Sequence, residues 1–244
     1  TITREGLESK VTPRTRAIVV NSPNNPTGHV IDYEEASVIV EFARDHDLLV
    51  VSDEIYEKIV YDGTRHVSLA ALPGAGERTL TINGFSKGYA MTGWRLGYVA
   101  GPQDIVAEIL KVQQHSVGCA GSFVQLGGIA ALTGDQVPVQ AMRETYAERR
   151  ALIVDGLNAI PGISCAAPSG SFYAFADIRE TGMATSAEFC QWLLRKARVA
   201  VTPGSAFGPG GEGYIRLSFA ASSEVISDAL KRIRNAVHAY AESI

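Results

Sequence analysis

Short apolar runs alternate with amphipathic stretches along the first half of the chain. Residues 17–20 and 48–51 are apolar without alternation, which is typical of strands buried on both faces of a sheet. Between them, Asp32 precedes apolar positions at helical spacing, and Glu35 completes a capping-box pattern three residues later. Further strands are predicted at 79–82 and 96–100. Strand, helix and strand in this order predict right-handed crossovers and an α/β fold with a largely parallel sheet.

The second half of the chain has a different pattern. It is mainly helical from Pro102 to about Ile160, with a break at 134–138 before a long charged helix at 139–158. After Pro161, short strands return around one amphipathic helix, so we expect a second, smaller α+β domain. Its expected elements are strands at 163–166, 172–176, 199–201 and 214–219, a helix at 187–196, and a last helix that Ser222 caps, with Ile226, Leu230, Ile233 and Val237 in one apolar stripe. The two expected domains are residues 1–145 and 146–244.

Composition and charge narrow the class of protein. Hydrophobic residues make up 46% of the 244 and charged residues 20%, as in ordinary globular domains. No apolar run is long enough to cross a bilayer, and the first residues lack the apolar core of a secretory signal. A net charge of −4 gives no reason to expect nucleic acid or an anionic membrane as a partner.

Cysteine and histidine usage points to a reducing compartment without a metal centre. Three widely spaced cysteines argue against a disulfide framework and fit the cytoplasm. The five histidines are not closely paired in sequence, and neither HExxH nor CxxC occurs, so no structural metal is expected. Buried thiols and surface imidazoles are the simpler interpretation of these residues.

Unusual residues follow three of the predicted strands. The segments are NSPNNPTG at 21–28, SDEIY at 52–56 and NGFSK at 83–87, the last leading into Arg95. Ligands collect at the carboxyl ends of parallel strands, so these segments are expected at one edge of the sheet. Each alone has an ordinary explanation as a turn, a helix cap or a surface charge. Their joint occurrence indicates a binding or catalytic site.

With these motifs the chain resembles the class I/II aminotransferases, which are fold-type I pyridoxal-phosphate (PLP) enzymes. The resemblance rests on NSPNNPTG, on SDEIY, on NGFSKGYAMTGWRLGY at 83–98 and on YIRLSFA at 214–220, and it extends over essentially the whole chain. MTGWRLGY is similar to the bacterial aspartate/aromatic subgroup. The resemblance implies a three-layer α/β/α large domain, only partly present in this chain, and a small C-terminal domain.

The resemblance assigns roles around the cofactor ring. Lys87 would form the Schiff base with PLP and move the substrate Cα proton. Asp53 would keep the pyridine nitrogen protonated, so that the ring accepts electrons. Tyr56 and Asn25 would hydrogen-bond the ring oxygen. A cap role for Asp53 and a core position for Tyr56 remain alternatives, and Asn25–Pro26 is a candidate cis peptide.

Further roles concern the phosphate and the substrate. Arg95 would bind the cofactor phosphate, with Ser86 adding a hydroxyl, although relatives often carry a serine where this chain has Gly84. Arg216 would bind the substrate α-carboxylate, with a structural ion pair as the alternative. Asn25 is also expected at the substrate. Phe172 and Tyr173 are expected near the pocket, with core packing as the simpler explanation for both.

The expected activity is transfer of an amino group from an amino acid to a 2-oxo acid such as 2-oxoglutarate, with aspartate or aromatic amino acids favoured. Another PLP reaction, of the β-lyase or cyclopropane-carboxylate synthase type, uses the same motifs and stays open. So does an inactive fragment, because family members carry a long segment upstream of NSPNNPTG. That segment supplies phosphate, ring and side-chain contacts and a tyrosine donated across a homodimer interface.

Overall fold

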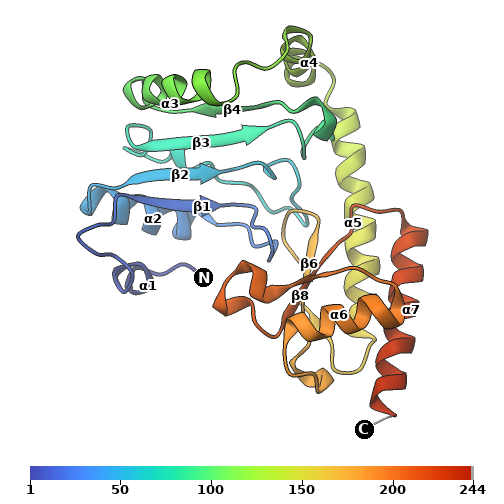
Figure 1. Cartoon of the computed structure of the whole chain (residues 1–244). Helices are drawn as coiled ribbons and strands as arrows, with labels where there is room; N and C mark the ends of the chain where they lie inside the picture. The colour runs from blue at the N-terminus through green and yellow to red at the C-terminus, as the bar shows by residue number, and fades with distance from the viewer. Residues whose placement is uncertain (243–244) are drawn as a thin grey trace. The chain divides into compact units, whose positions relative to one another are not determined.

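The computed structural model describes residues 1–242, which divide into two compact units (Figure 1). One unit comprises residues 1–23 and 30–140, and the other comprises 24–29 and the chain from 141 onward. The division falls inside helix α5 (Val137–Asn158). The expected assignment of residues 1–145 to a cofactor-binding domain and 146–244 to a small domain stays a prediction.

The first unit is built on a four-stranded sheet in the order β1-β2-β3-β4, as Figure 1 shows. The strands are β1 (Ala17–Asn21), β2 (Leu49–Asp53), β3 (Thr79–Gly84) and β4 (Gly97–Ala100). The first three are parallel, and β4 runs antiparallel to β3. The predicted α/β fold with a largely parallel sheet is therefore confirmed.

Helix α2 (Tyr33–Asp45) packs on one face of this sheet and makes the core of the unit. Its start is the predicted capping box, in which the Asp32 side chain accepts from the Glu35 amide and the Glu35 side chain accepts from the Asp32 amide. Ile39 on the helix and Val50 on β2 are both fully buried at 0% exposure. The cap explains where the helix begins, and the apolar spacing explains why its apolar side packs on the sheet.

The opposite face of the sheet corrects one prediction. Strand β1 is not buried on both faces, since Val19 is 74% exposed while its neighbour Val20 is 6% exposed. Ile82 on β3 is also 40% exposed. An apolar run predicts burial only where a second layer packs on the strand, and within residues 1–242 this part of the sheet has its helix on one side.

Helices complete the first unit. They are α1 (Arg4–Glu8), α3 (Gln103–Ser116) and α4 (Ser122–Thr133), with short 3-10 helices η1 (Leu69–Ala71) and η2 (Thr92–Trp94). Glycines let α4 approach the segment that follows β3. A Cβ on Gly127 would lie 2.6 Å from the Trp94 ring, and one on Gly128 would lie 2.5 Å from Leu96. No helix among the described residues is both long and apolar enough to span a membrane.

The second unit contains another four-stranded sheet, in the order β5-β6-β8-β7, and all its pairs are antiparallel. Its elements are β5 (Ser164–Cys165), β6 (Tyr173–Asp177), η3 (Arg179–Thr181), α6 (Ser186–Ala197), β7 (Thr202–Pro203), η4 (Gly204–Phe207), η5 (Pro209–Gly211), β8 (Tyr214–Ser218) and α7 (Ser223–Ala241). The strand predicted at 199–201 is wrong: pairing with β8 begins at Thr202. The predicted Ser222 cap and the apolar stripe of α7 are confirmed, and all four stripe residues are buried.

Candidate active site

Asp53 ends β2 at the carboxyl edge of the first sheet. In the ladder it pairs with Asn21 on β1 and with Ile82 on β3. Its carbonyl oxygen accepts hydrogen bonds from the Ser22 amide at 3.1 Å and from Asn21 Nδ2 at 3.1 Å. The end of β1 and the start of the segment after it are thereby tied to this residue, which fixes the main chain of Asp53.

The Asp53 carboxylate is half-buried and lightly hydrogen-bonded. Its Oδ1 accepts from the Ile55 amide at 3.2 Å. Burial raises the pKa of Asp53, the Ile55 N–H opposes this, and the charge of Glu54 raises it further. Among the described residues nothing donates a hydrogen bond to its second oxygen. The expected alternative role of Asp53, a helix cap, does not account for it, because the following segment forms a turn rather than a helix.

Tyr56 and Lys87 come together from two different strand ends. Tyr56 follows β2 and is 4% exposed. Lys87 follows β3 in a tight segment in which the Ala90 amide donates to the Lys87 carbonyl at 3.2 Å. The Lys87 Nζ lies 5.9 Å from the centroid of the Tyr56 ring. A half-buried lysine over a buried phenol ring therefore stands in the same unit as Asp53.

The predicted phosphate residues are less closely tied to this group. Arg95 is exposed, lies in the left-handed region at φ 53°, and donates from Nη1 to the Thr92 carbonyl at 3.0 Å. Ser86 is half-buried. Gly84 has a steric reason: a Cβ there would lie 3.0 Å from the Leu96 carbonyl oxygen. In this chain a serine at 84 would crowd the β3–β4 approach, which leaves Ser86 as the available hydroxyl.

Arg216 lies in the middle of β8 in the second unit. Its Nη1 donates to Asn25 Oδ1 at 2.8 Å, and its Nη2 donates to Thr202 Oγ1 at 3.3 Å. Its guanidinium carbon lies 4.4 Å from the centroid of the Tyr173 ring and 4.9 Å from that of Phe207. Two aromatic rings and two polar oxygens hold the guanidinium without a carboxylate, so the structural ion pair considered for Arg216 is not present among these contacts.

The segment 24–29 brings Asn25 to Arg216. The Asn24 amide donates to the His29 carbonyl at 2.8 Å, which closes the segment into a loop. Gly28, at φ +69°, accepts at its carbonyl from the Gly170 amide at 2.8 Å. A Cβ on Gly28 would lie 2.2 Å from Pro168, so only glycine fits there. The Asn25–Pro26 bond, a candidate from the sequence, is cis, and the Ser22–Pro23 bond is cis as well.

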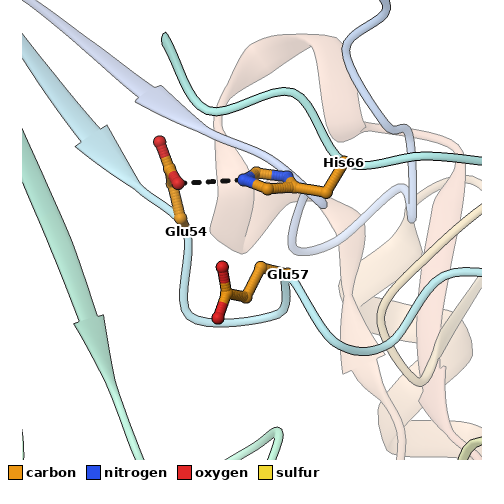
Figure 2. Close-up of side chains that lie close together, drawn as sticks. All are labelled: Glu54, Glu57 and His66. Atoms are coloured by element: carbon orange, nitrogen blue, oxygen red, sulfur yellow. Dashed lines mark hydrogen bonds and ion pairs between the residues drawn. The ribbon is translucent and has the colours of Figure 1, made fainter. Parts of the chain in front are cut away.

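Sequence reasoning missed a buried group beside Asp53. Glu54, 2% exposed, pairs with His66 Nε2 at 2.9 Å, and Glu57 lies near them (Figure 2). Ligand atoms of these three residues lie within 4.8 Å of one another, so in the described chain they form a group able to hold a metal ion. A signal was present, because Glu54 stands two positions after Ser52, which is buried on β2, but its pairing with a residue twelve positions away was not visible in the sequence.

The structure thus brings the predicted site residues together in two groups. Asp53, Tyr56 and Lys87 belong to the first unit, whereas Asn25 and Arg216 belong to the second. Both predicted aromatic neighbours, Phe172 and Tyr173, are buried at 8% exposure, and their rings pack on each other with centroids 4.9 Å apart. Tyr173 also covers Arg216, so it contributes to a polar contact as well as to the core.

A parallel sheet whose strand ends carry a half-buried carboxylate, a phenol and a lysine is typical of an α/β protein that binds a ligand at that edge of the sheet. Comparison with known families makes this specific: the family model for aminotransferase class I and II matches residues 1–233, and the chain belongs to that family. Members of the family depend on pyridoxal 5′-phosphate. The predicted family and cofactor class are confirmed.

Individual relatives agree with this family. An aspartate aminotransferase from Musicola paradisiaca is 53% identical over 243 residues, which is 100% of this chain and 61% of the relative. Aromatic-amino-acid aminotransferase 2 from Thermococcus litoralis is 44% identical over 93% of this chain and 58% of its own length. The crystal structure of an aromatic aminotransferase from Pyrococcus horikoshii superposes with a TM-score of 0.94 at 44% identity, covering 98% of this chain and 64% of that one. The chain spans about 60% of the length of these curated relatives.

Proposed function

We propose that this chain is part of a PLP-dependent aminotransferase, with Lys87 as the lysine that holds the cofactor. The observation that carries the proposal is the position of the Lys87 amine 5.9 Å from the Tyr56 ring centroid, at the sheet edge that also carries Asp53. A lysine in such a setting, within a chain of this family, is a candidate for covalent attachment of an aldehyde. The whole reaction, its substrates and its partners are proposed on this basis.

The residues of the first unit fit the cofactor's ring. Burial raises the pKa of the Asp53 carboxylate, and its Oδ2 accepts no hydrogen bond from the described residues. A protonated ring nitrogen would be a donor to this oxygen, and its positive charge would stabilise the ionised carboxylate. Asp53 would in turn hold the proton on that nitrogen.

When bound, PLP supplies an aldehyde for the substrate amino group and a ring that accepts the electron pair left when the Cα–H bond breaks. The part of Lys87 is to hold the cofactor, and then, as a free amine, to take the proton from the substrate Cα. Tyr56 would hydrogen-bond the cofactor's ring oxygen. The predicted contact of Asn25 with the same oxygen stays a prediction.

Two cationic residues would bind anionic groups. Arg95 is exposed and makes one main-chain hydrogen bond through Nη1, so its remaining donors suit a phosphate, to which Ser86 would add a hydroxyl. Arg216 would bind the substrate α-carboxylate. Its support is the fixed orientation of the guanidinium between Tyr173 and Phe207, because a planar fork held in place loses little freedom when it binds a carboxylate.

We propose aspartate and aromatic amino acids as donors, because the relatives are named for them, and 2-oxoglutarate as acceptor. We also propose a homodimer in the cytoplasm. Exposed apolar residues on α4, such as Phe123 at 73% and Leu126 at 66%, support self-association, and the three free cysteines support a reducing compartment. Light scattering and cell fractionation test these two points.

Borohydride reduction in the presence of PLP, followed by peptide mapping, tests the cofactor lysine. Reduction should fix the cofactor on Lys87, and Lys87→Ala should remove both the label and the visible absorbance. Lys58→Ala is the matched control, since Lys58 is an exposed lysine of the same unit that pairs with Glu57. A label on another lysine, or retained absorbance in Lys87→Ala, would contradict the assignment.

A second measurement separates transamination from other reactions of the same cofactor. Adding aspartate or an aromatic amino acid alone should abolish the visible absorbance of the loaded protein, and adding 2-oxoglutarate should restore it. A β-lyase or cyclopropane-carboxylate synthase would instead release its product without needing the oxo acid.

A further inference from the structure

Glu54 is a buried carboxylate with no part in the proposed chemistry, although it directly follows Asp53. Successive residues of a strand point to opposite faces, so in β2 Ser52 lies on the buried side and Asp53 on the other. Glu54 directly follows the strand, and its hydrogen bond with Ser52 places its carboxylate on the buried side. Glu54 is 2% exposed. A buried charge needs several hydrogen bonds to be tolerated, and its partners are therefore informative.

Three side chains satisfy the Glu54 carboxylate. Its Oε1 accepts from Ser52 Oγ at 2.9 Å and from Ser68 Oγ at 2.9 Å. Its Oε2 pairs with His66 Nε2 at 2.9 Å, as Figure 2 shows. Burial raises the pKa of Glu54, but the hydrogen bond and charge of His66, with the two hydroxyls, outweigh it, and the net pKa is lowered. The carboxylate is therefore held as an anion.

The main chain of Glu54 is fixed as well. Its amide donates to the Ile82 carbonyl at 2.8 Å on β3, and its own carbonyl accepts from the Glu57 amide at 2.9 Å. The Ser52–Glu54 hydrogen bond joins the two sequence neighbours of Asp53 on the face opposite to the Asp53 carboxylate. The contacts of Glu54 with Ser52, His66 and Ser68 thus hold the end of β2 on the face opposite to the Asp53 carboxylate. We call this set of contacts the clamp.

A metal ion explains this group less well than the clamp does. Glu57 lies close to Glu54 and His66, yet its carboxylate makes no bond with either in Figure 2 and pairs with Lys58 at 3.7 Å. Both Glu54 oxygens already accept hydrogen bonds from protein donors. A cation would have to displace His66 from one of the three 2.9 Å contacts that hold Glu54.

We propose that Glu54 and His66 are positioning residues, which act through the end of β2 to hold the Asp53 carboxylate toward the cofactor's ring nitrogen. The identity of that partner rests on the proposed function, whereas the clamp itself does not. The charged residue that bears on the pKa of Asp53 is Glu54, and His66 and Glu57 lie next to Glu54; Tyr56 and Lys87 are the titratable residues at the sheet edge that carries Asp53. Of these, Glu54 acts on Asp53 through both geometry and charge.

Carbon-13 NMR titration of the Asp53 carboxyl in the cofactor-free protein tests the clamp, with Asp53→Asn to assign the signal. In Glu54→Gln the pKa of Asp53 should fall toward its ordinary value, since the carboxylate becomes better solvated and loses a negative neighbour. His66→Gln helps to separate the two causes. Because His66 lowers the pKa of Glu54, the Glu54 carboxyl is titrated in the same spectra, and a fall in the pKa of Asp53 while Glu54 stays ionised reports lost positioning. Glu57→Gln removes an equal charge from the same group and should leave Asp53 unchanged.

The loaded protein gives a second readout. Glu54→Gln and His66→Gln should shift the pH dependence of the cofactor's visible absorbance, and Glu57→Gln should not. Ser68→Ala, which removes a single hydrogen bond, should show a smaller change in the same direction and serves if either clamp variant fails to fold. An Asp53 titration that is identical in the wild type and all clamp variants would overturn the proposal. Absence of bound cofactor in the wild type would instead count against the proposed function, with the NMR result standing by itself.

Discussion

Replacing Phe207 by leucine tests whether the aromatic rings around Arg216 contribute to carboxylate binding. Phe207 is 36% exposed and its ring centroid lies 4.9 Å from the guanidinium carbon, while Tyr173 on the other contact is 8% exposed at 4.4 Å. Leucine retains much of the apolar volume and removes the negatively polarised ring face. The substitution therefore isolates the cation–π contact from simple packing.

The size of the effect follows from the exposure of the ring. Cation–π contacts are worth about 0.5–1 kcal/mol at exposed sites and about 2 kcal/mol when desolvated. Phe207 lies between these cases, so a loss of about 1 kcal/mol is expected. Since about 1.4 kcal/mol corresponds to a factor of ten, substrate binding should weaken roughly fivefold. The hydrogen bonds of Arg216 to Asn25 and Thr202 remain in the variant, which keeps the loss from being larger.

Steady-state kinetics with several amino acids and 2-oxo acids provide the assay. Every substrate carries the carboxylate, so KM should rise by a similar factor for all of them while kcat stays close to that of the wild type, the pattern of lost uniform binding. Phe175→Leu makes the same chemical change on the ring that packs edge-on against Phe207 at 6.3 Å, and serves as the control. Unchanged KM in Phe207→Leu, or a fall in kcat alone, would refute the reasoning.

Three further predictions concern stability and reactivity. Asp32→Ala removes the N-cap of α2 and should lower the free energy of unfolding by about 1 kcal/mol in urea titrations, whereas an unchanged midpoint would mean that the cap contributes nothing. Asp53→Asn should stabilise the cofactor-free protein at neutral pH, because the pKa of Asp53 is raised in the folded state. The wild type therefore loses stability as the pH rises from the ordinary aspartate pKa through the folded-state pKa, and the variant does not. Urea titrations across that range decide it, and parallel curves for the two proteins would count against the raised pKa. Thiol labelling of the native protein should modify exposed Cys119 alone, because burial raises the pKa of Cys165 and of Cys190 to about 11; rapid native labelling of either would contradict their burial.

Elements specified by local signals could be predicted from the sequence. The capping box at Asp32 and the apolar stripe of α7 depend on residues three or four positions apart, and both are found in the structure. The strand predicted at 199–201 depended on β-branched propensity alone. The chain instead leaves α6 through Arg198 at φ 57° and pairs with β8 only from Thr202, because strand formation needs a partner in register.

The candidate site divides in the same way. Asp53, Lys87 and Arg216 lie in motifs that can be recognised in the sequence from the family resemblance. Asp53 and Lys87 were also expected at the ends of strands. The contact of Phe207 with Arg216 joins residues on different elements, and so does the pairing of His66 with Glu54. No spacing rule in one sequence specifies such contacts, since loop geometry brings the partners together.

Asp53 and Glu54 show how the end of one strand can give two adjacent carboxylates different roles. Alternation sends Glu54 to the covered face, where three donors satisfy it and its pKa is lowered, and Asp53 to the opposite face, where burial without comparable hydrogen bonding raises its pKa. An anion that three protein donors already hold does not depend on a ligand for its stabilisation, and it serves to fix the chain. A buried anion with few hydrogen bonds destabilises the cofactor-free protein, and a cationic donor that binds to it offsets this cost. Asp53, which lowers the stability of the cofactor-free protein, is therefore the residue available for binding, and Glu54 holds it in place.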